Sequence, residues 1–302
     1  MNVMLYESSY NEVKGFLNKE TPSFGFSLRD LTSNNLICVR VRRTSDNDER
    51  DFRPLDITNG ELLSYVGDGN EGFVARWVNQ FNQDEYYEQT DTSKQPQIVY
   101  NVGGTATLVT TNAVAGELPS IDFGGFGFVT NGFLEGGDYE PSQDLLIIAV
   151  IRPQAIDPSS DGYIFDNFTS SGRGLLQDNF SSGTYTFIND TTSSTPNRLR
   201  AGVPSTDLTV ITARIKSDAV TLANNQWEMY FNGVLAVSDN GTLLPYQARS
   251  GSTNIGAGTG SGSDPFLGRI SEILIYRGNN LDYTQKIVEK NVIGYYADDL
   301  NL

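Results

Sequence analysis

Short hydrophobic runs, separated by turns rich in glycine, asparagine and serine, dominate the chain. The segment Leu145 to Arg152 is apolar up to its last residue, which predicts a strand buried on both faces within a sheet. Asn232-Gly233 predicts a tight hairpin turn. Alternating or β-branched runs predict further strands at Leu36 to Arg42, Thr184 to Ile188, Thr209 to Ile215, Trp227 to Phe231, Val234 to Val237 and Ile270 to Tyr276.

Two segments have a helical pattern instead. Thr58-Asn-Gly-Glu61 has the spacing of a capping box and Gly67 that of a helix stop, so we expect a short helix near 59–66. Asp282 predicts the start of an amphipathic helix near 283–296, whose apolar face includes Val288 and Val292. We expect this helix to pack on the edge of a β-sandwich, in preference to binding a partner.

Composition narrows the chemistry that this β-rich chain can perform. Its 302 residues include 21 Lys and Arg against 37 Asp and Glu, a net charge of −16, and no histidine. The absence of histidine excludes Ser-His-Asp and Cys-His nucleophile systems and histidine metal sites. Cys38 is the single cysteine, so no intrachain disulfide or cysteine zinc site can form. The negative charge argues against a nucleic-acid partner.

The first residues form a candidate arm. Residues 1–22 lack the apolar run of a secretory signal, and no run in the chain is long enough for membrane insertion. Apolar residues such as Leu5 and Phe16 need burial, either on a neighbouring subunit or along the same domain. We favour docking onto a neighbour, and expect residues 23–302 to form one domain.

An ordered series of motifs carries a family resemblance. It comprises Phe26-Ser-Leu-Arg29, Ile37-Cys-Val-Arg-Val-Arg-Arg-Thr-Ser-Asp46, Leu62-Leu-Ser-Tyr-Val-Gly-Asp-Gly-Asn70, Val74-Ala-Arg-Trp77 and Gln95-Pro-Gln-Ile-Val99. The series resembles the concanavalin A-like jelly-roll module of the arabinofuranosidase B catalytic domain and related modules of bacteriophage virion and tail proteins. Towards the C-terminus, Phe266 to Tyr276 resembles laminin-G-like closing strands. The resemblance covers roughly residues 24–296 and implies a two-sheet antiparallel jelly-roll sandwich.

The resemblance also locates the positions at which a glycosidase of this type holds its two carboxylates. The nucleophile would follow Phe165-Asp166 and falls at about Ser171, and the acid would follow Ile255-Gly256 and falls at Gly258. Neither is a carboxylate, although a retaining glycosidase needs two about 5 Å apart. We therefore expect a non-enzymatic protein. The alternative is a glycoside hydrolase of the arabinofuranosidase type that uses displaced carboxylates, Asp166 and Asp264.

Several residues are candidates for binding. Trp77, Asn79, Asp166 and Asp264 are the candidate carbohydrate-binding residues, although a tryptophan within a strand, such as Trp77 or Trp227, is more often core. Asp161, Asp166, Asp178 and Asp264 could ligate calcium, but their spacing does not support a site, so no metal or cofactor is expected. The segment Asp84 to Glu88 exposes two tyrosines among acids, as a subunit interface or as a solvated loop.

The function favoured by these observations is that of a structural or adhesion protein of a bacteriophage virion, such as a capsid decoration, tail or fibre component. Its expected partners are other virion proteins and further copies of itself, and its expected location is a virion assembled in the host cytoplasm. Binding of host-surface glycans is a refinement of this role.

Overall fold

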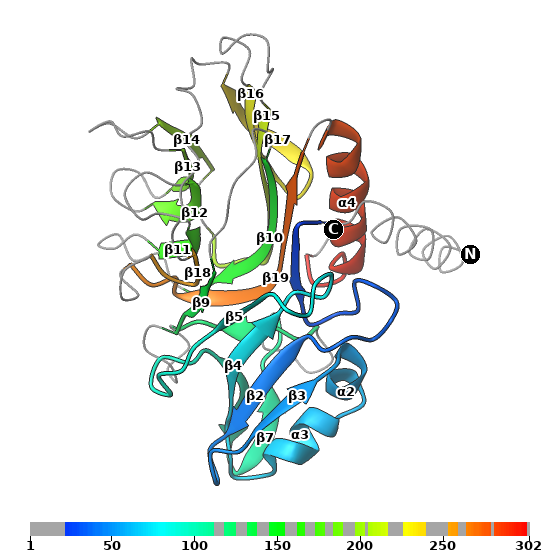
Figure 1. The fold of residues 1–302 in the computed structure, drawn as a ribbon. Coiled ribbons are helices and arrows are strands. Elements are labelled where there is room, and N and C mark those ends of the chain that lie inside the picture. Colours follow the sequence, from blue (N-terminus) through cyan, green and yellow to red (C-terminus); the bar gives the residue numbers. More distant parts are fainter. Residues whose placement is uncertain are drawn as a thin grey trace.

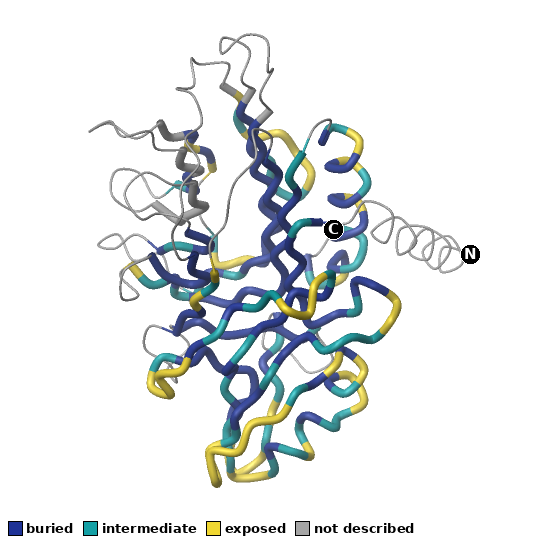
Figure 2. Tube along the Cα trace, viewed as in Figure 1, coloured by how far each residue is buried: buried dark blue, intermediate teal, exposed yellow. Residues whose placement is uncertain are grey.

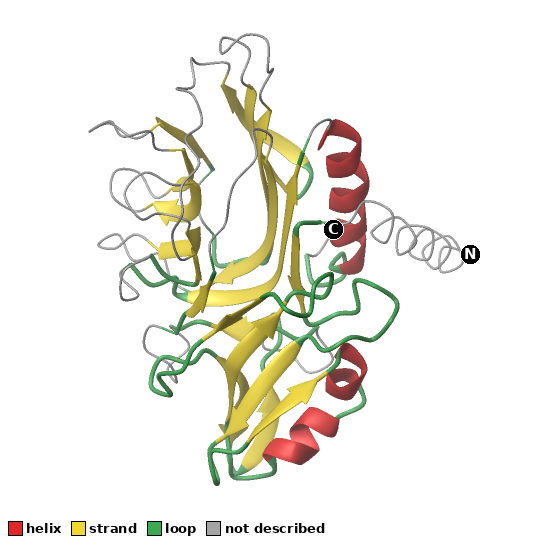
Figure 3. Ribbon diagram, in the orientation of Figure 1, coloured by secondary structure: helices red, strands yellow, loops and turns green. Residues whose placement is uncertain are grey.

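Antiparallel strands make up about half of the described part of the chain, with helices on the outside (Figures 1 and 3). The structure is a computed structural model, and it describes residues 22–111, 118–124, 132–137, 145–154, 162–166, 173–178, 184–189, 197–202, 205–216, 226–239, 253–258, 264–278 and 281–300. Every ladder between the described strands is antiparallel, as the expected jelly-roll sandwich requires.

The first layer of the sandwich has the strand order β17–β16–β15–β10–β19–β1. Its longest strands, β10 and β19, lie side by side at its centre. The strands of this layer are β1 (Phe24–Ser27), β10 (Leu145–Pro153), β15 (Thr209–Lys216), β16 (Gln226–Phe231), β17 (Val234–Asp239) and β19 (Gly268–Arg277).

The second layer has the strand order β14–β13–β12–β11–β18–β9–β5–β4–β2–β3. The two layers are joined because β6 pairs with β4 and β8, and β8 pairs with β19. The remaining strands are β2 (Val39–Arg43), β3 (Glu49–Phe52), β4 (Gly72–Val78), β5 (Tyr86–Glu88), β6 (Gln97–Val102), β7 (Thr105–Leu108), β8 (Ile121–Asp122), β9 (Leu134–Gly136), β11 (Gly162–Asp166), β12 (Arg173–Asp178), β13 (Thr184–Asn189), β14 (Asn197–Ala201) and β18 (Thr253–Ile255).

Two hydrophobic cores lie on opposite faces of the first layer. Side chains alternate along a strand, so Ile147 and Ala149 of β10 enter the core between the layers, whereas Ile148 and Val150 enter a second core on the outer face. All of β10 from Leu145 to Ile151 is buried, and Figure 2 shows this strand as part of a continuous dark-blue centre. The prediction of a strand covered on both faces is confirmed.

The C-terminal helix α4 (Leu281–Tyr295) supplies the cover for the outer core. Val288 and Val292 pack with Ile148 and Val150, so the helix lies across the face of the first layer (Figure 1). The helix near 283–296 is thus confirmed, but its expected place on the sheet edge is wrong. The physical reason is that the outward apolar side chains of β10 need a cover that an edge position would not give.

Polar side chains anchor α4 to this face. Arg214 of β15 donates a hydrogen bond to Gln285 Oε1 at 2.6 Å, and Thr212 donates one to Glu289 Oε1 at 2.6 Å. Burial raises the pKa of Glu289 above its usual value, and the hydrogen bonds that it accepts from Thr212 and Gln285 oppose that rise. These contacts set the register of the helix on the sheet.

The short helical region differs in detail from the expected single helix near 59–66. Two helices are present, α2 (Pro54–Thr58) and α3 (Glu61–Val66), and Gly67 ends the second as expected. The capping box at Thr58 to Glu61 is wrong, because Thr58 Oγ1 donates back to Pro54 O within α2. A proline is well tolerated in the first turn of a helix, and Pro54 begins α2 in this way.

The other expected strands agree with the structure, with one correction. Strands occur at all the positions expected from residue 184 onwards, and Asn232-Gly233 turns β16 into β17. The strand expected at Leu36 to Arg42 begins only at Val39. Most of the predicted arm, residues 1–21, lies outside the described residues. Among the helices that the structure describes, none has the length and apolarity needed to cross a bilayer.

A buried ion pair holds the N-terminal strand to the C-terminal one. Arg29, which follows β1, contacts Glu272 of β19 through Nε at 2.6 Å and Nη2 at 2.8 Å, and both side chains are almost fully buried. Burial alone would lower the pKa of Arg29, but the Glu272 carboxylate raises it above its ordinary value. Ser27 Oγ donates a third hydrogen bond to Glu272 at 2.8 Å. This bidentate arrangement fixes β1 at the edge of the first layer.

Removing one partner of this pair is expected to destabilise the protein strongly. Glu272→Gln leaves the Arg29 charge buried without its counterion, which should lower the free energy of unfolding by about 3–5 kcal/mol, measured by urea denaturation. Asp51→Asn is the matched control: it breaks the one-third-exposed pair of Arg40 and Asp51 and should cost only about 0–1 kcal/mol. Equal effects of the two substitutions would contradict the assignment.

Candidate functional site

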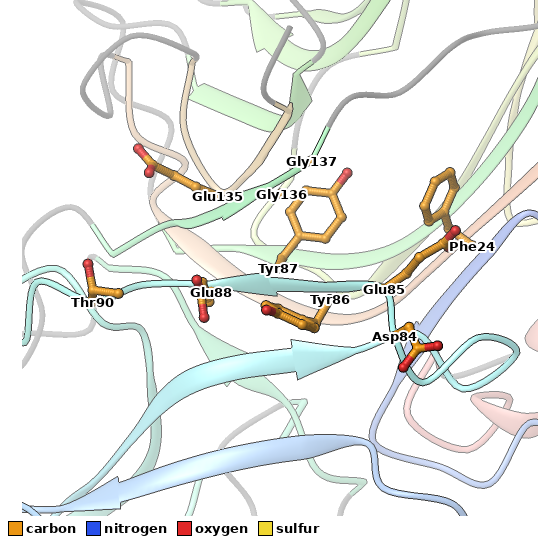
Figure 4. A pocket seen from close by; sticks show the side chains of 10 residues that line it. All are labelled: Phe24, Asp84, Glu85, Tyr86, Tyr87, Glu88, Thr90, Glu135, Gly136 and Gly137. Atoms are coloured by element: carbon orange, nitrogen blue, oxygen red, sulfur yellow. The ribbon is translucent and has the colours of Figure 1, made fainter.

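A cavity of about 510 Å³ opens where β5 meets β9 (Figure 4). The two strands touch through a single pairing, Glu88 with Glu135, so their ends diverge and leave space between them. The lining combines aromatic rings, carboxylates and glycines: Phe24, Asp84, Glu85, Tyr86, Tyr87, Glu88, Thr90, Glu135, Gly136 and Gly137. The volume lies in the range of small-molecule sites, roughly 300–1,000 Å³.

The two tyrosines of β5 point to opposite sides of the strand (Figure 4). Tyr87 is buried against Phe26, with ring centroids 5.0 Å apart, and its hydroxyl bonds with Thr253 Oγ1. Tyr86 is partly exposed, and the Arg76 guanidinium lies 3.7 Å from its ring centroid. The expectation that both tyrosines are exposed is therefore wrong for Tyr87, because strand alternation turns it into the core.

Four carboxylates line the cavity, and they differ in how they are held. Glu85 accepts a hydrogen bond from Asn79 Nδ2 at 2.9 Å, and Glu88 pairs with Arg76 at 2.9 Å. Asp84 and Glu135 are exposed, and their carboxylates have no hydrogen bond or ion pair with the described residues. The ten lining residues include no lysine or arginine, so the cavity is negatively charged.

A polar row continues from the cavity across the second layer. Glu135 is directly opposite Asn254 of β18, which is directly opposite Asp166 of β11. Opposed residues of an antiparallel ladder lie on the same face of the sheet. Asn254 is almost fully buried: its Nδ2 donates to Gly258 O at 2.8 Å, while its Oδ1 has no hydrogen-bond partner. The row thus leads from the open cavity to the segment that contains Gly258, the position at which the resemblance places the acid of the glycosidase.

The structure places two of the four predicted carbohydrate-binding residues inside the protein. Trp77 has no exposed surface and packs against Phe26, with ring centroids 5.8 Å apart. Asn79 is equally buried, and its Oδ1 accepts hydrogen bonds from the amides of Gly25 and Phe81. Trp227 is also buried, so the core interpretation of both tryptophans agrees with the structure. Asn79 does reach the cavity indirectly, through its hydrogen bond to Glu85.

The other two predicted residues are not brought together. Asp166, at the end of β11, is buried, whereas Asp264 is exposed and its carbonyl accepts a hydrogen bond from Tyr163 N near the start of the same strand. Three residues along a strand separate Tyr163 from Asp166, roughly 10 Å. Ser171 and Asp161 lie outside the described residues, as does the side chain of Asp178. In the described part of the chain no three acids or cysteines gather as metal ligands.

The comparisons with known proteins agree with this architecture. Residues 139–279 match the family model described as the concanavalin A-like lectin/glucanases superfamily. An arabinofuranosidase complexed with arabinofuranosyl-α-1,2-xylobiose superimposes with a TM-score of 0.61 at 13% identity, over 93% of this chain and 64% of that chain. The fold is concanavalin A-like. The predicted resemblance to this superfamily and to the arabinofuranosidase is confirmed at the level of the fold, and the resemblance to bacteriophage modules stays a prediction.

Two further solved structures are similar to this concanavalin A-like chain. A GH54 α-L-arabinofuranosidase soaked with 4-nitrophenyl α-L-arabinofuranoside has a TM-score of 0.62 at 12% identity, over 93% of this chain and 65% of that one. The sialidase CBM40 module of Ruminococcus gnavus bound to α2,3-sialyllactose has a TM-score of only 0.41 at 14% identity, over 56% and 95%. The chain thus spans less than two thirds of the arabinofuranosidases. No protein of curated function matches its sequence.

Substitution of Gly136, which lines the cavity, tests how closely the Tyr87 ring packs against β9 to form the cavity wall. A Cβ at Gly136 would lie 2.4 Å from the buried Tyr87 ring, so Gly136→Ala must displace that ring and should cost about 1–3 kcal/mol of unfolding free energy, measured by thermal and urea denaturation. Gly137→Ala is the matched control, because a Cβ there meets nothing within 4 Å. If both variants were as stable as the parent, Tyr87 would not form this wall.

Proposed function

We propose that this concanavalin A-like protein binds carbohydrate in the cavity between β5 and β9. The observation that carries the proposal is the lining itself, which combines the partly exposed Tyr86 ring with the carboxylates of Asp84 and Glu135. An aromatic ring offers apolar area to the C–H groups of a sugar, and carboxylates accept hydrogen bonds from its hydroxyls. Arg76, which contacts both Tyr86 and Glu88, holds the ring in place.

We propose further that binding is not followed by cleavage. Asp166 is buried and Asp264 is exposed at the other end of β11, which does not favour the alternative of displaced catalytic carboxylates. Glu88 and Glu135 do oppose each other at the cavity, but neither is buried. A glycosidase acid is normally held protonated by an apolar environment. Assays with 4-nitrophenyl glycosides should therefore show no turnover, and turnover lost in Glu135→Gln would contradict this proposal and assign cleavage to the cavity.

The proposed setting of this binding is a bacteriophage virion, in which the protein serves as a structural or adhesion component beside other virion proteins. Support comes from the motif series between Phe26 and Val99. It also comes from β17, which pairs only with β16 among the described strands and exposes Val234 and Leu235. An exposed apolar edge of this kind is suited to contact with another chain.

Loss of the aromatic platform should weaken sugar binding. Tyr86→Ala is expected to lower affinity roughly two- to tenfold for any glycan that a microarray identifies, measured by isothermal titration calorimetry. Tyr283→Ala is the matched control, since Tyr283 is an exposed tyrosine on α4 and is not among the residues that line the cavity. An unchanged affinity in Tyr86→Ala, or an equal loss in Tyr283→Ala, would place the sugar elsewhere.

The proposed structural role predicts association between copies. Light scattering of the full chain should give the mass of a closed oligomer, such as a trimer, because the apolar residues of the arm need burial on a neighbour. Removal of residues 1–22 should reduce the mass to that of a monomer. A full chain that is monomeric at all concentrations would contradict both the docking of the arm and the virion role.

A further inference from the structure

The charged side chains that line the cavity between β5 and β9 are all acidic. Four of its ten lining residues are carboxylates and none is a cation. Two cations adjoin the lining: Arg76 contacts Glu88 and the ring of Tyr86, and the Arg277 guanidinium lies 5.1 Å from the ring centroid of Phe24. The four lining carboxylates outnumber these two cations, and the whole chain carries a net charge of −16. A ligand with a carboxylate would therefore enter a region of like charge.

Hydrogen-bond acceptors outnumber donors among the side chains that line the cavity. Ionised carboxylates only accept hydrogen bonds, and the hydroxyl of Tyr87 is engaged with Thr253, so the hydroxyls of Tyr86 and Thr90 are the other side-chain donors of the lining. The next polar atom inward along the row, Asn254 Oδ1, is a further acceptor without a partner. Its orientation is fixed because Asn254 Nδ2 donates to Gly258 O. The site thus has acceptors that need donors, and sugar hydroxyls supply donors whereas a sugar carboxylate does not.

We infer that this cavity selects its glycan by charge: it takes uncharged sugar units and rejects acidic ones such as uronates and sialic acid. Asp84 and Glu135 determine the selectivity, because they are the two lining carboxylates that no described cation or amide neutralises. The inference rests on the proposed function and adds the class of ligand. Both residues lie outside the core, so they can be neutralised without disturbing the fold.

Matched pairs of sugars test the selectivity. Saturation-transfer NMR at low salt compares galactose with galacturonate, glucose with glucuronate, mannose with mannuronate, and lactose with 3′-sialyllactose. The neutral member of at least one pair should bind, and its acidic partner should bind at least tenfold more weakly. A higher salt concentration should reduce the difference in affinity between the neutral and the acidic sugar, since screening weakens repulsion between exposed charges.

A double variant separates the local charges from the charge of the whole protein. The double variant Asp84→Asn with Glu135→Gln should reduce the ratio of the affinity for neutral sugars to that for acidic sugars by about threefold to tenfold. The control is the double variant Glu49→Gln with Asp207→Asn, which changes the net charge by the same amount at exposed residues outside the cavity. It should leave the ratio of the two affinities unchanged.

Each outcome decides a different point. Equal or tighter binding of the acidic partners, with the neutral sugars also bound, would overturn the charge selection and leave sugar binding in place. An equal narrowing in both double variants would overturn the assignment to Asp84 and Glu135. Absence of binding by every sugar of the panel to every variant would overturn the selectivity together with the proposed function.

Discussion

Strand β10 has to be shielded from water on both faces, and most of the architecture follows from that constraint. Its inward residues meet the second layer of the sandwich, and its outward residues, such as Ile148 and Val150, can be covered only by another element. Helix α4 provides that cover, and Arg214 and Thr212 of the neighbouring strand fix its position. The molecule is thus a sandwich with a third layer on one side.

The second layer is where polar groups become available. Within it, β5 and β9 meet at one residue pair, and the cavity forms beside that contact. The same strands carry both kinds of residue: Tyr87 and Leu134 turn inward, while Glu88 and Glu135 remain accessible. Strand alternation therefore produces a packed wall and a charged rim from segments of only three residues each.

Much of the fold could be predicted from local pattern. Leu145 to Ile151, the hairpin at Asn232-Gly233 and the C-terminal helix all have signals that lie within a few residues. The site could be predicted only in part, because it depends on contacts between distant segments. The sequence shows that the segment Asp84 to Glu88 has two tyrosines among acidic residues. Nothing in the short segment Leu134 to Gly136 indicates that it pairs with this segment. The residue types of Trp77 and Asn79 suggest carbohydrate binding, whereas burial, which no local pattern gives, makes both residues parts of the interior.

The pairing of β1 with β19 has a consequence for how the chain reaches its structure. Ser27 and Glu272 are 245 residues apart in sequence, yet they share a hydrogen bond at the edge of the first layer. This contact can form only after the ribosome has synthesised both residues. Strand β1 therefore cannot pair with β19 until the strands that lie between them in the sequence have been made. Contacts of such large sequence separation slow folding, because the entropy of closing the loop is lost before the contact stabilises anything. During that interval, the apolar side chains of β1, Phe24 and Phe26, are exposed to other chains.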